Sequence, residues 1–125
     1  MRAIATGYDH PTWSDGTASI VRARACERSI TGKDTSLANA KLDTGSGIDE
    51  MVITSQVRTA NGTIKASTLC DVFGSFTSGH ECDVDWIHPA GSTANCEGRT
   101  YVTVFFTNGN VKGTDPVISP LQGCG

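Results

Sequence analysis

The sequence is poor in aromatic residues and has no long hydrophobic run. Among 125 residues there are two Trp, two Tyr and four Phe, and the hydrophobic fraction is 38%. No apolar stretch approaches the roughly 20 residues that a membrane-spanning helix needs, and no signal-peptide pattern is visible. These absences predict a protein without a membrane span. The length fits one domain, residues 1–125, whose modest core needs further stabilisation.

The chain also lacks an excess of positive charge. Ten Lys and Arg residues stand against thirteen Asp and Glu residues, so the formal net charge is −3. Nucleic-acid binding depends on clustered basic groups that neutralise phosphates. The composition therefore predicts that nucleic acid is not a partner.

The cysteines lack the spacing of a metal site. There are five: Cys26, Cys70, Cys82, Cys96 and Cys124. No CxxC pair occurs among them, although structural zinc sites usually contain one. Disulfides are the favoured interpretation, and they indicate an oxidising compartment, so we expect a secreted or extracellular protein. Two intramolecular bridges would leave one thiol available for linkage between molecules.

Helical periodicity is absent as well, and β-branched segments alternate with turn residues that include many of the fourteen glycines. The clearest element is a hairpin over 51–72. Its tip, Asn61-Gly62, favours a two-residue type I′ turn. That turn would pair Ala60 with Thr63 and, further along, Ile53 with Cys70.

Further strands are predicted around this hairpin. They cover residues 17–30, 35–42, 81–88 and 101–107, the last leading into a second Asn-Gly turn. Residues 1–16 and 89–98 have the composition of loops, and the proline-containing tail from residue 115 is not expected to form an interior strand. The predicted fold is all-β: a disulfide-stabilised antiparallel β-sandwich or small β-barrel of about six to eight strands.

The strand patterns also favour one disulfide. Cys70 falls on the inward face of the hairpin, and Cys82 shares the inward face of the 81–88 strand with Val84 and Trp86. The residues between the two cysteines are rich in Gly and Ser, which suits a chain reversal. We therefore expect a Cys70–Cys82 bridge.

One motif suggests catalysis. The sequence Leu42-Asp43-Thr44-Gly45-Ser46 resembles the active-site signature of aspartic peptidases, in which an apolar strand leads into a D-[ST]-G turn. The resemblance implies a homodimer of retroviral type, in which two Asp43 carboxylates share a proton and activate water. The same residues also suit an exposed turn. The leading interpretation assigns no catalytic residue, and the peptidase using Asp43 is the alternative.

Other candidate residues point to binding. Tyr8 and Trp13 lie in a predicted loop and could stack on a ligand, whereas Trp86 is in phase with the core. The three histidines are scattered, no G-x-S-x-G elbow occurs, and no metal or cofactor is predicted. The leading hypothesis is a non-catalytic extracellular protein. It would bind a protein or carbohydrate ligand, or assemble with itself on a surface or particle.

Overall fold

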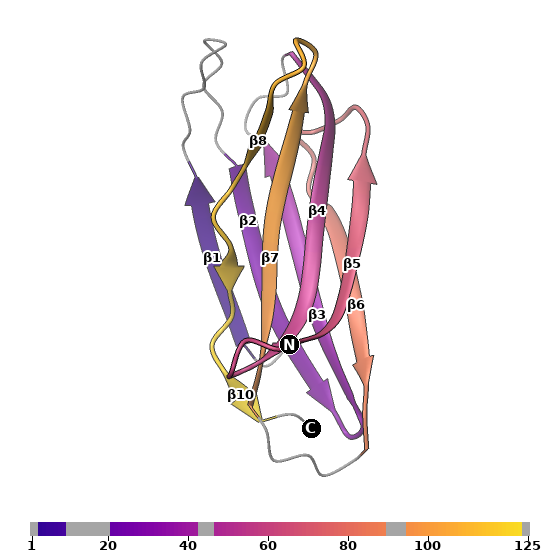
Figure 1. Cartoon of the computed structure of the whole chain (residues 1–125), viewed down its shortest axis with the longest axis vertical. Helices are drawn as coiled ribbons and strands as arrows, with labels where there is room; N and C mark the ends of the chain where they lie inside the picture. The colour runs from indigo at the N-terminus through magenta and orange to yellow at the C-terminus, as the bar shows by residue number, and fades with distance from the viewer. Residues whose placement is uncertain (1–2, 10–20, 43–46, 90–94, 124–125) are drawn as a thin grey trace.

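All regular structure in the described part of the chain is β-strand (Figure 1). The computed structural model describes residues 3–9, 21–42, 47–89 and 95–123. The strands are β1 (Ala3–Asp9), β2 (Val21–Ile30), β3 (Lys33–Leu42), β4 (Ile48–Thr59), β5 (Ile64–Val72), β6 (His80–Ile87), β7 (Asn95–Phe106), β8 (Val111–Gly113), β9 (Val117–Ile118) and β10 (Gln122–Gly123). None of these residues belongs to a helix that could cross a membrane.

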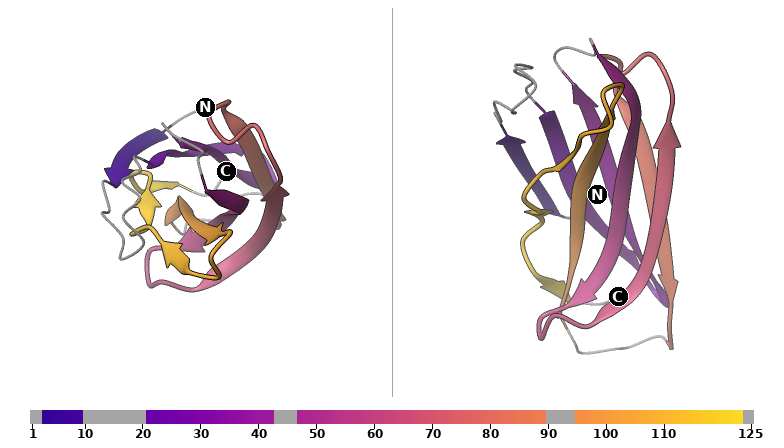
Figure 2. Two further views of the ribbon diagram at one scale, coloured as in Figure 1. Left: turned by 90° about the horizontal axis from the view of Figure 1, so that it is seen from above. Right: turned by 45° about the horizontal axis from the view of Figure 1, so that its top comes forward.

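The strands form two antiparallel sheets. One has the order β1-β2-β3-β6; the other has the order β10-β7-β4-β5, and β8 and β9 also pair with β7. The sheets face each other across a common interior and do not close into a barrel (Figure 2). The predicted β-sandwich is therefore confirmed, and the barrel alternative is wrong.

Three predicted loops or tails contain strands. Residues 3–9 form β1, although 1–16 was expected to be loop, because they pair along β2 from Asp9↔Val21 to Ala3↔Glu27. The β7 strand already begins at Asn95, inside the predicted 89–98 loop. The tail contributes only β9 and β10, two short segments at the edge beside β7. Prolines interrupt this edge because they offer no N–H for a ladder.

The β4–β5 hairpin keeps most of its predicted register. Ile53 pairs with Cys70 and Val57 with Ala66, as expected. The predicted Ala60–Thr63 pairing is wrong, because the loop contains three residues.

The side chain of Asn61 explains the longer loop. Its Oδ1 accepts hydrogen bonds from the Thr63 backbone N–H (3.1 Å) and from Thr59 Oγ1 (2.5 Å). The Thr59 N–H donates to the Thr63 carbonyl (2.9 Å), and the Gly62 N–H donates to the Thr59 carbonyl (2.9 Å). Gly62 has a φ of 88°, whereas Asn61 does not take the positive φ that a type I′ turn demands. Hairpin loops of three residues usually consist of a tight turn followed by a glycine with positive φ.

A bulge in β5 compensates for the extra loop residue. Arg58 pairs with Ile64 and Val57 pairs with Ala66, so Lys65 is the additional residue between these two pairs. A bulge changes the direction of nearby side chains and increases local twist. The bulge therefore returns the rest of β5 to the predicted register, in which alternate side chains face the interior. It also gives the Lys65 side chain a direction that strict alternation would not give.

Replacing Gly62 with valine should lower the free energy of unfolding by about 1–3 kcal/mol, the usual range for a non-glycine residue forced into left-handed backbone. A Cβ at Gly62 would meet no atom within 4 Å, so the loss would come from the φ of 88° and not from a clash. Urea denaturation measures the change. Gly62→Asn is the control, because Asn tolerates this conformation. Equal stability of the valine and asparagine variants would contradict the assigned turn.

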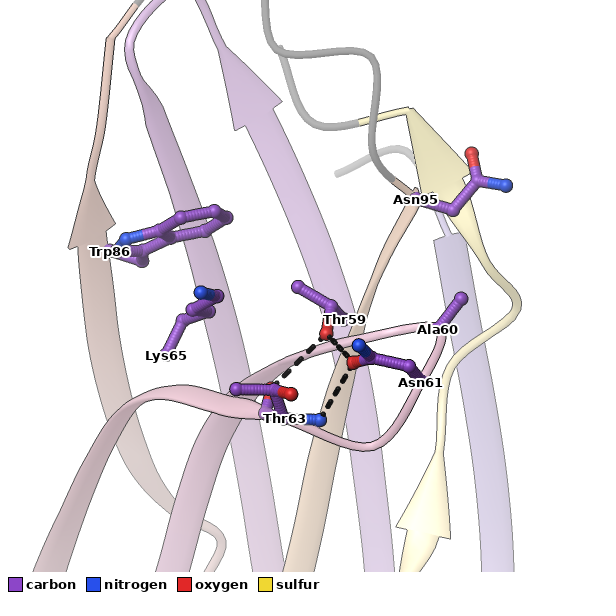
Figure 3. Close-up of a pocket in the computed structure, with 7 residues that line it drawn as sticks. All are labelled: Thr59, Ala60, Asn61, Thr63, Lys65, Trp86 and Asn95. Carbon is purple, nitrogen blue, oxygen red and sulfur yellow. Dashed lines mark hydrogen bonds between the residues drawn. The ribbon is translucent and has the colours of Figure 1, made fainter.

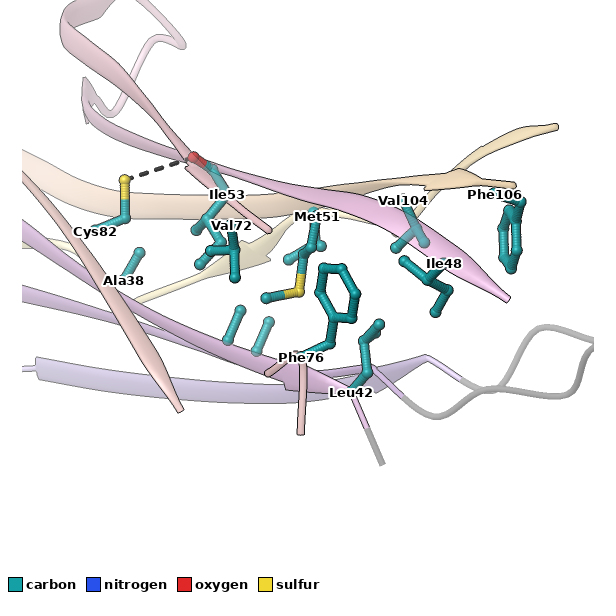
Figure 4. Packing of buried hydrophobic residues seen from close by; sticks show 13 residues of the cluster. Ala38, Leu42, Ile48, Met51, Ile53, Val72, Phe76, Cys82, Val104 and Phe106 are labelled. Atoms are coloured by element: carbon teal, nitrogen blue, oxygen red, sulfur yellow. Dashed lines mark hydrogen bonds between the residues drawn. The ribbon is translucent and has the colours of Figure 1, made fainter. Parts of the chain in front are cut away.

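The interior differs between the two ends of the sandwich. Leu42, Met51, Phe76, Val104 and Phe106 fill the end shown in Figure 4, and all are buried. The two sheets approach each other closely beside Ser36. A Cβ at Gly98, for example, would lie 3.0 Å from the Cys26 carbonyl oxygen.

The opposite end has a polar interior. Glu27, Asp34, Ser36 and Ser55 are all completely buried there. The Ser55 hydroxyl lies 3.2 Å from the Ser36 carbonyl oxygen and 3.1 Å from the Ser36 hydroxyl. Buried polar groups of this kind require specific partners. The apolar end therefore supplies most of the hydrophobic core, and the polar end is where a site can form.

The predicted Cys70–Cys82 disulfide is confirmed. It joins β5 to β6, which are edge strands of different sheets, with a Cα–Cα distance of 5.8 Å. The bridge therefore links the two sheets where no backbone ladder does. Cys26 and Cys96 are both buried. Cys124 lies outside the described residues, and the second bridge stays a prediction.

Candidate functional site

A pocket of about 490 Å³ opens at the polar end of the sandwich (Figure 3). The β4–β5 hairpin tip, β6 and the start of β7 form its walls. Its lining residues are Thr59, Ala60, Asn61, Thr63, Lys65, Trp86 and Asn95. The volume lies within the range of small-molecule sites, which runs from about 300 to 1,000 Å³.

The hairpin tip is held in place by its own hydrogen bonds. The Asn61 carbonyl oxygen already accepts from Thr59 and Thr63, which leaves the Nδ2 amide hydrogens for another partner. The Ala60 N–H donates to the backbone carbonyl of Asn95 (3.1 Å), which ties the tip to the start of β7. This part of the pocket wall is therefore preformed.

Lys65 reaches the pocket through the β5 bulge. Its Nζ lies 5.5 Å from the centroid of the Trp86 ring, a cation–π contact (Figure 3). Ion pairs in the described part of the chain involve other basic side chains, and none involves Lys65. The ammonium group therefore faces an aromatic ring and has no carboxylate partner there.

Trp86 also contacts a buried ion pair. Its ring centroid lies 4.3 Å from that of His88, at an interplanar angle of 38°. His88 Nε2 lies 2.5 Å from Asp34 Oδ2, and both side chains are almost fully buried. His88 Nδ1 lies 2.9 Å from the carbonyl oxygen of Pro89, which can only accept, so Nδ1 donates. The Asp34–His88 pair thus fixes the imidazole against which Trp86 packs.

The geometry around His88 does not form a catalytic triad. A general-base histidine must keep one ring nitrogen for the nucleophile. Both nitrogens of His88 are already used, by Asp34 and by Pro89. His80 Nε2 lies 2.9 Å from the Ser75 carbonyl oxygen, and His10 lies outside the described residues. The pocket itself offers an aromatic surface, amide and hydroxyl groups, and one cation.

The acidic residues of β6 face outward, as the alternation predicted. Burial, followed by the charge and hydrogen bond of neighbouring Glu81, raises the pKa of Asp83 to about 6. Asp85 accepts a hydrogen bond from Thr35 Oγ1 (2.6 Å) and lies 3.9 Å from Lys33 Nζ. Across the described ranges, no group of three His, Cys, Asp or Glu residues is arranged to hold a metal ion.

The structure adds Trp86 to the candidate binding residues. Trp86, predicted to lie in the core, is only half-buried and lines the pocket. Tyr8 lies in β1 opposite Arg22, whereas the described pocket wall comes from β4 to β7. Trp13 and the Asp43–Ser46 motif lie outside the described residues, so the predictions for them remain untested.

Sequence reasoning missed Lys65 and Asn95 as pocket residues. Asn95 falls in the predicted 89–98 loop, and strict alternation along the 51–72 hairpin predicts that Lys65 faces outward. The position of Lys65 depends on a bulge, which alternation in the sequence does not reveal. The one signal of the pocket in the sequence is Trp86, an inward-facing aromatic residue near the end of its strand.

Fold and site together define an open antiparallel β-sandwich with a polar, aromatic-lined pocket at one end. Comparison of the chain with protein-family models, with curated proteins and with solved structures finds no match. The function must therefore be argued from the pocket itself.

Proposed function

We propose that this chain is a non-catalytic, extracellular β-sandwich that binds a carbohydrate in the Trp86 pocket. The observation that carries the proposal is the partly exposed indole of Trp86 with Asn and Thr side chains around it. Aromatic rings pack against the apolar faces of sugar rings, and amide and hydroxyl groups hydrogen-bond sugar hydroxyls. The Cys70–Cys82 disulfide is compatible with an extracellular location.

The pocket is also rigid enough for selective binding. Its wall is braced by the Asn61 hydrogen bonds, and Trp86 is packed against the buried His88 ring. A preformed site loses less conformational entropy when its ligand binds. The peptidase alternative depends on Asp43, which lies outside the described residues, and it stays a prediction, as does self-assembly.

Replacing Trp86 with alanine should weaken carbohydrate binding about tenfold or more. The change removes the stacking surface, and aromatic packing contributes about 0.5–1.5 kcal/mol beyond the area that it buries. Isothermal titration with glucose, galactose, mannose, N-acetylglucosamine and glucuronate measures the effect, with circular dichroism to verify folding.

Phe73→Ala is the matched control, because Phe73 is 72% exposed and does not line the pocket. This variant should bind as the unmodified protein does. The proposal would be wrong if none of the five sugars bound, or if Trp86→Ala and Phe73→Ala affected binding equally.

A further inference from the structure

We infer that the saccharide carries an anionic group, which pairs with Lys65; this inference rests on the proposed function. Lys65 is the one charged side chain among the seven residues that line the pocket. The site therefore presents a single positive charge to whatever enters it.

Three acidic side chains on the strands around the pocket pair with other basic groups. Asp34 pairs with His88, Asp85 lies 3.9 Å from Lys33, and Glu97 on β7 pairs with Arg58. Each of these carboxylates already has a basic partner. The carboxylate that would complement Lys65 is thus missing from the described residues, and a ligand can supply it.

Asn61 offers the pocket a hydrogen-bond donor as well. Asn61 uses its Oδ1 within the hairpin, so its Nδ2 hydrogens are the part left for a ligand. An ammonium group and an amide N–H group together suit the several lone pairs of a carboxylate or sulfate. A neutral sugar would not use this charge.

The resting position of Lys65 adds to the selectivity. Its ammonium lies over the Trp86 ring, where a sugar would stack. A ligand must therefore displace the ammonium from the ring. An anionic saccharide provides a new partner for the displaced cation, whereas a neutral saccharide leaves it unpaired. The contact between Lys65 and Trp86 thus favours ligands that combine a sugar ring with a negative charge.

Isothermal titration of the full chain with glucuronate, glucose 6-sulfate, glucose and acetate tests the inference. We expect at least one of the two anionic sugars to bind about tenfold more tightly than glucose, the effect of one charge-assisted hydrogen bond. Comparing them separates a carboxylate-binding site from a sulfate-binding site. Acetate, which has the charge without the ring, should bind far more weakly than either.

Lys65→Met should remove the preference for the anionic sugar over glucose, and Lys65→Arg should preserve the preference. Lys112→Met is the control, since Lys112 lies on β8 and outside the pocket lining. Added salt should weaken binding of the anionic sugar more than binding of glucose.

Equal affinities for glucose and both anionic sugars, unchanged by Lys65→Met, would overturn the charge preference while leaving carbohydrate binding in place. Acetate binding as tightly as glucuronate would also overturn it, because the site would then recognise an anion without a sugar. If no sugar binds at all, the proposed function itself is wrong.

Discussion

Replacing His88 with alanine is expected to lower the free energy of unfolding by about 3–5 kcal/mol, the usual loss when one partner of a buried ion pair is removed. Asp34 is completely buried, and its Oδ2 bonds to His88 at 2.5 Å. Its Oδ1 has no hydrogen-bond partner among the described residues. Without His88, neither oxygen of this carboxyl group would have a partner. Urea denaturation followed by circular dichroism measures the change.

A double-mutant cycle separates the pair interaction from the loss of packing. Asp34→Ala alone removes the acceptor of His88, and the double variant removes both partners, so no buried charge is left unpaired. We expect the double variant to be more stable than the sum of the two single changes predicts, by about 0.5–3 kcal/mol. Strict additivity would contradict a direct Asp34–His88 interaction.

His88→Ala should also disturb the pocket, because the imidazole packs against Trp86 at 4.3 Å between ring centroids. His88→Phe keeps an aromatic ring at this position and removes the hydrogen bonds. Comparing the two variants separates two roles of His88. One is the packing of its ring against Trp86, and the other is the stabilisation of the fold by its pair with Asp34.

Loss of the Cys70–Cys82 disulfide should lower the free energy of unfolding by about 3 kcal/mol, the chain-entropy expectation for a loop of this size. The two cysteines are separated by 12 positions and connect edge strands of different sheets. Without the bridge, this side of the sandwich depends on side-chain packing alone. The Cys70→Ala/Cys82→Ala variant, compared with the unmodified protein in urea, tests the expectation.

The cavity left by Cys82 must be separated from the loss of the bridge, because Cys82 is only 1% exposed and belongs to the core. Cys82→Ala and the double variant both lack the bridge and the Cys82 sulfur. The difference between their free energies of unfolding therefore reports the loss of the Cys70 sulfur alone. Mild reduction of the unmodified protein removes the bridge and keeps both sulfur atoms. Labelling of all five cysteines in the native protein by a thiol reagent, without prior reduction, would contradict the bridge and the oxidising compartment.

Local sequence patterns predicted the elements whose two faces differ. Ile53 and Cys70 were paired correctly because alternation and the Asn-Gly position agree on one register. The inward positions of Cys82 and Val84 followed from the same alternation. The sequence does not reveal β1, because the 1–16 segment has the composition of a loop and only pairing with β2 makes residues 3–9 a strand.

The pocket was harder to predict because its residues come from separate strands. Periodicity places Trp86 in the core, and it does pack against the buried Val57 and Cys96, but its place at the end of the sandwich leaves part of the ring exposed to the pocket. The Asp34–His88 pair joins residues 54 positions apart, and no local pattern marks either as buried. The Lys65 side chain reaches Trp86 because a bulge follows the hairpin loop.

Local patterns in the chain predict the all-β class, the main hairpin register and the Cys70–Cys82 bridge, because period-two alternation and turn chemistry act over a few residues. Tertiary structure alone decided that the sheets stay open, that the interior has an apolar end and a polar end, and that Trp86, Lys65 and Asn61 surround one pocket. These features depend on the packing of one sheet against the other. Residues far apart in the chain meet there, and their burial and charge balance arise only from that contact.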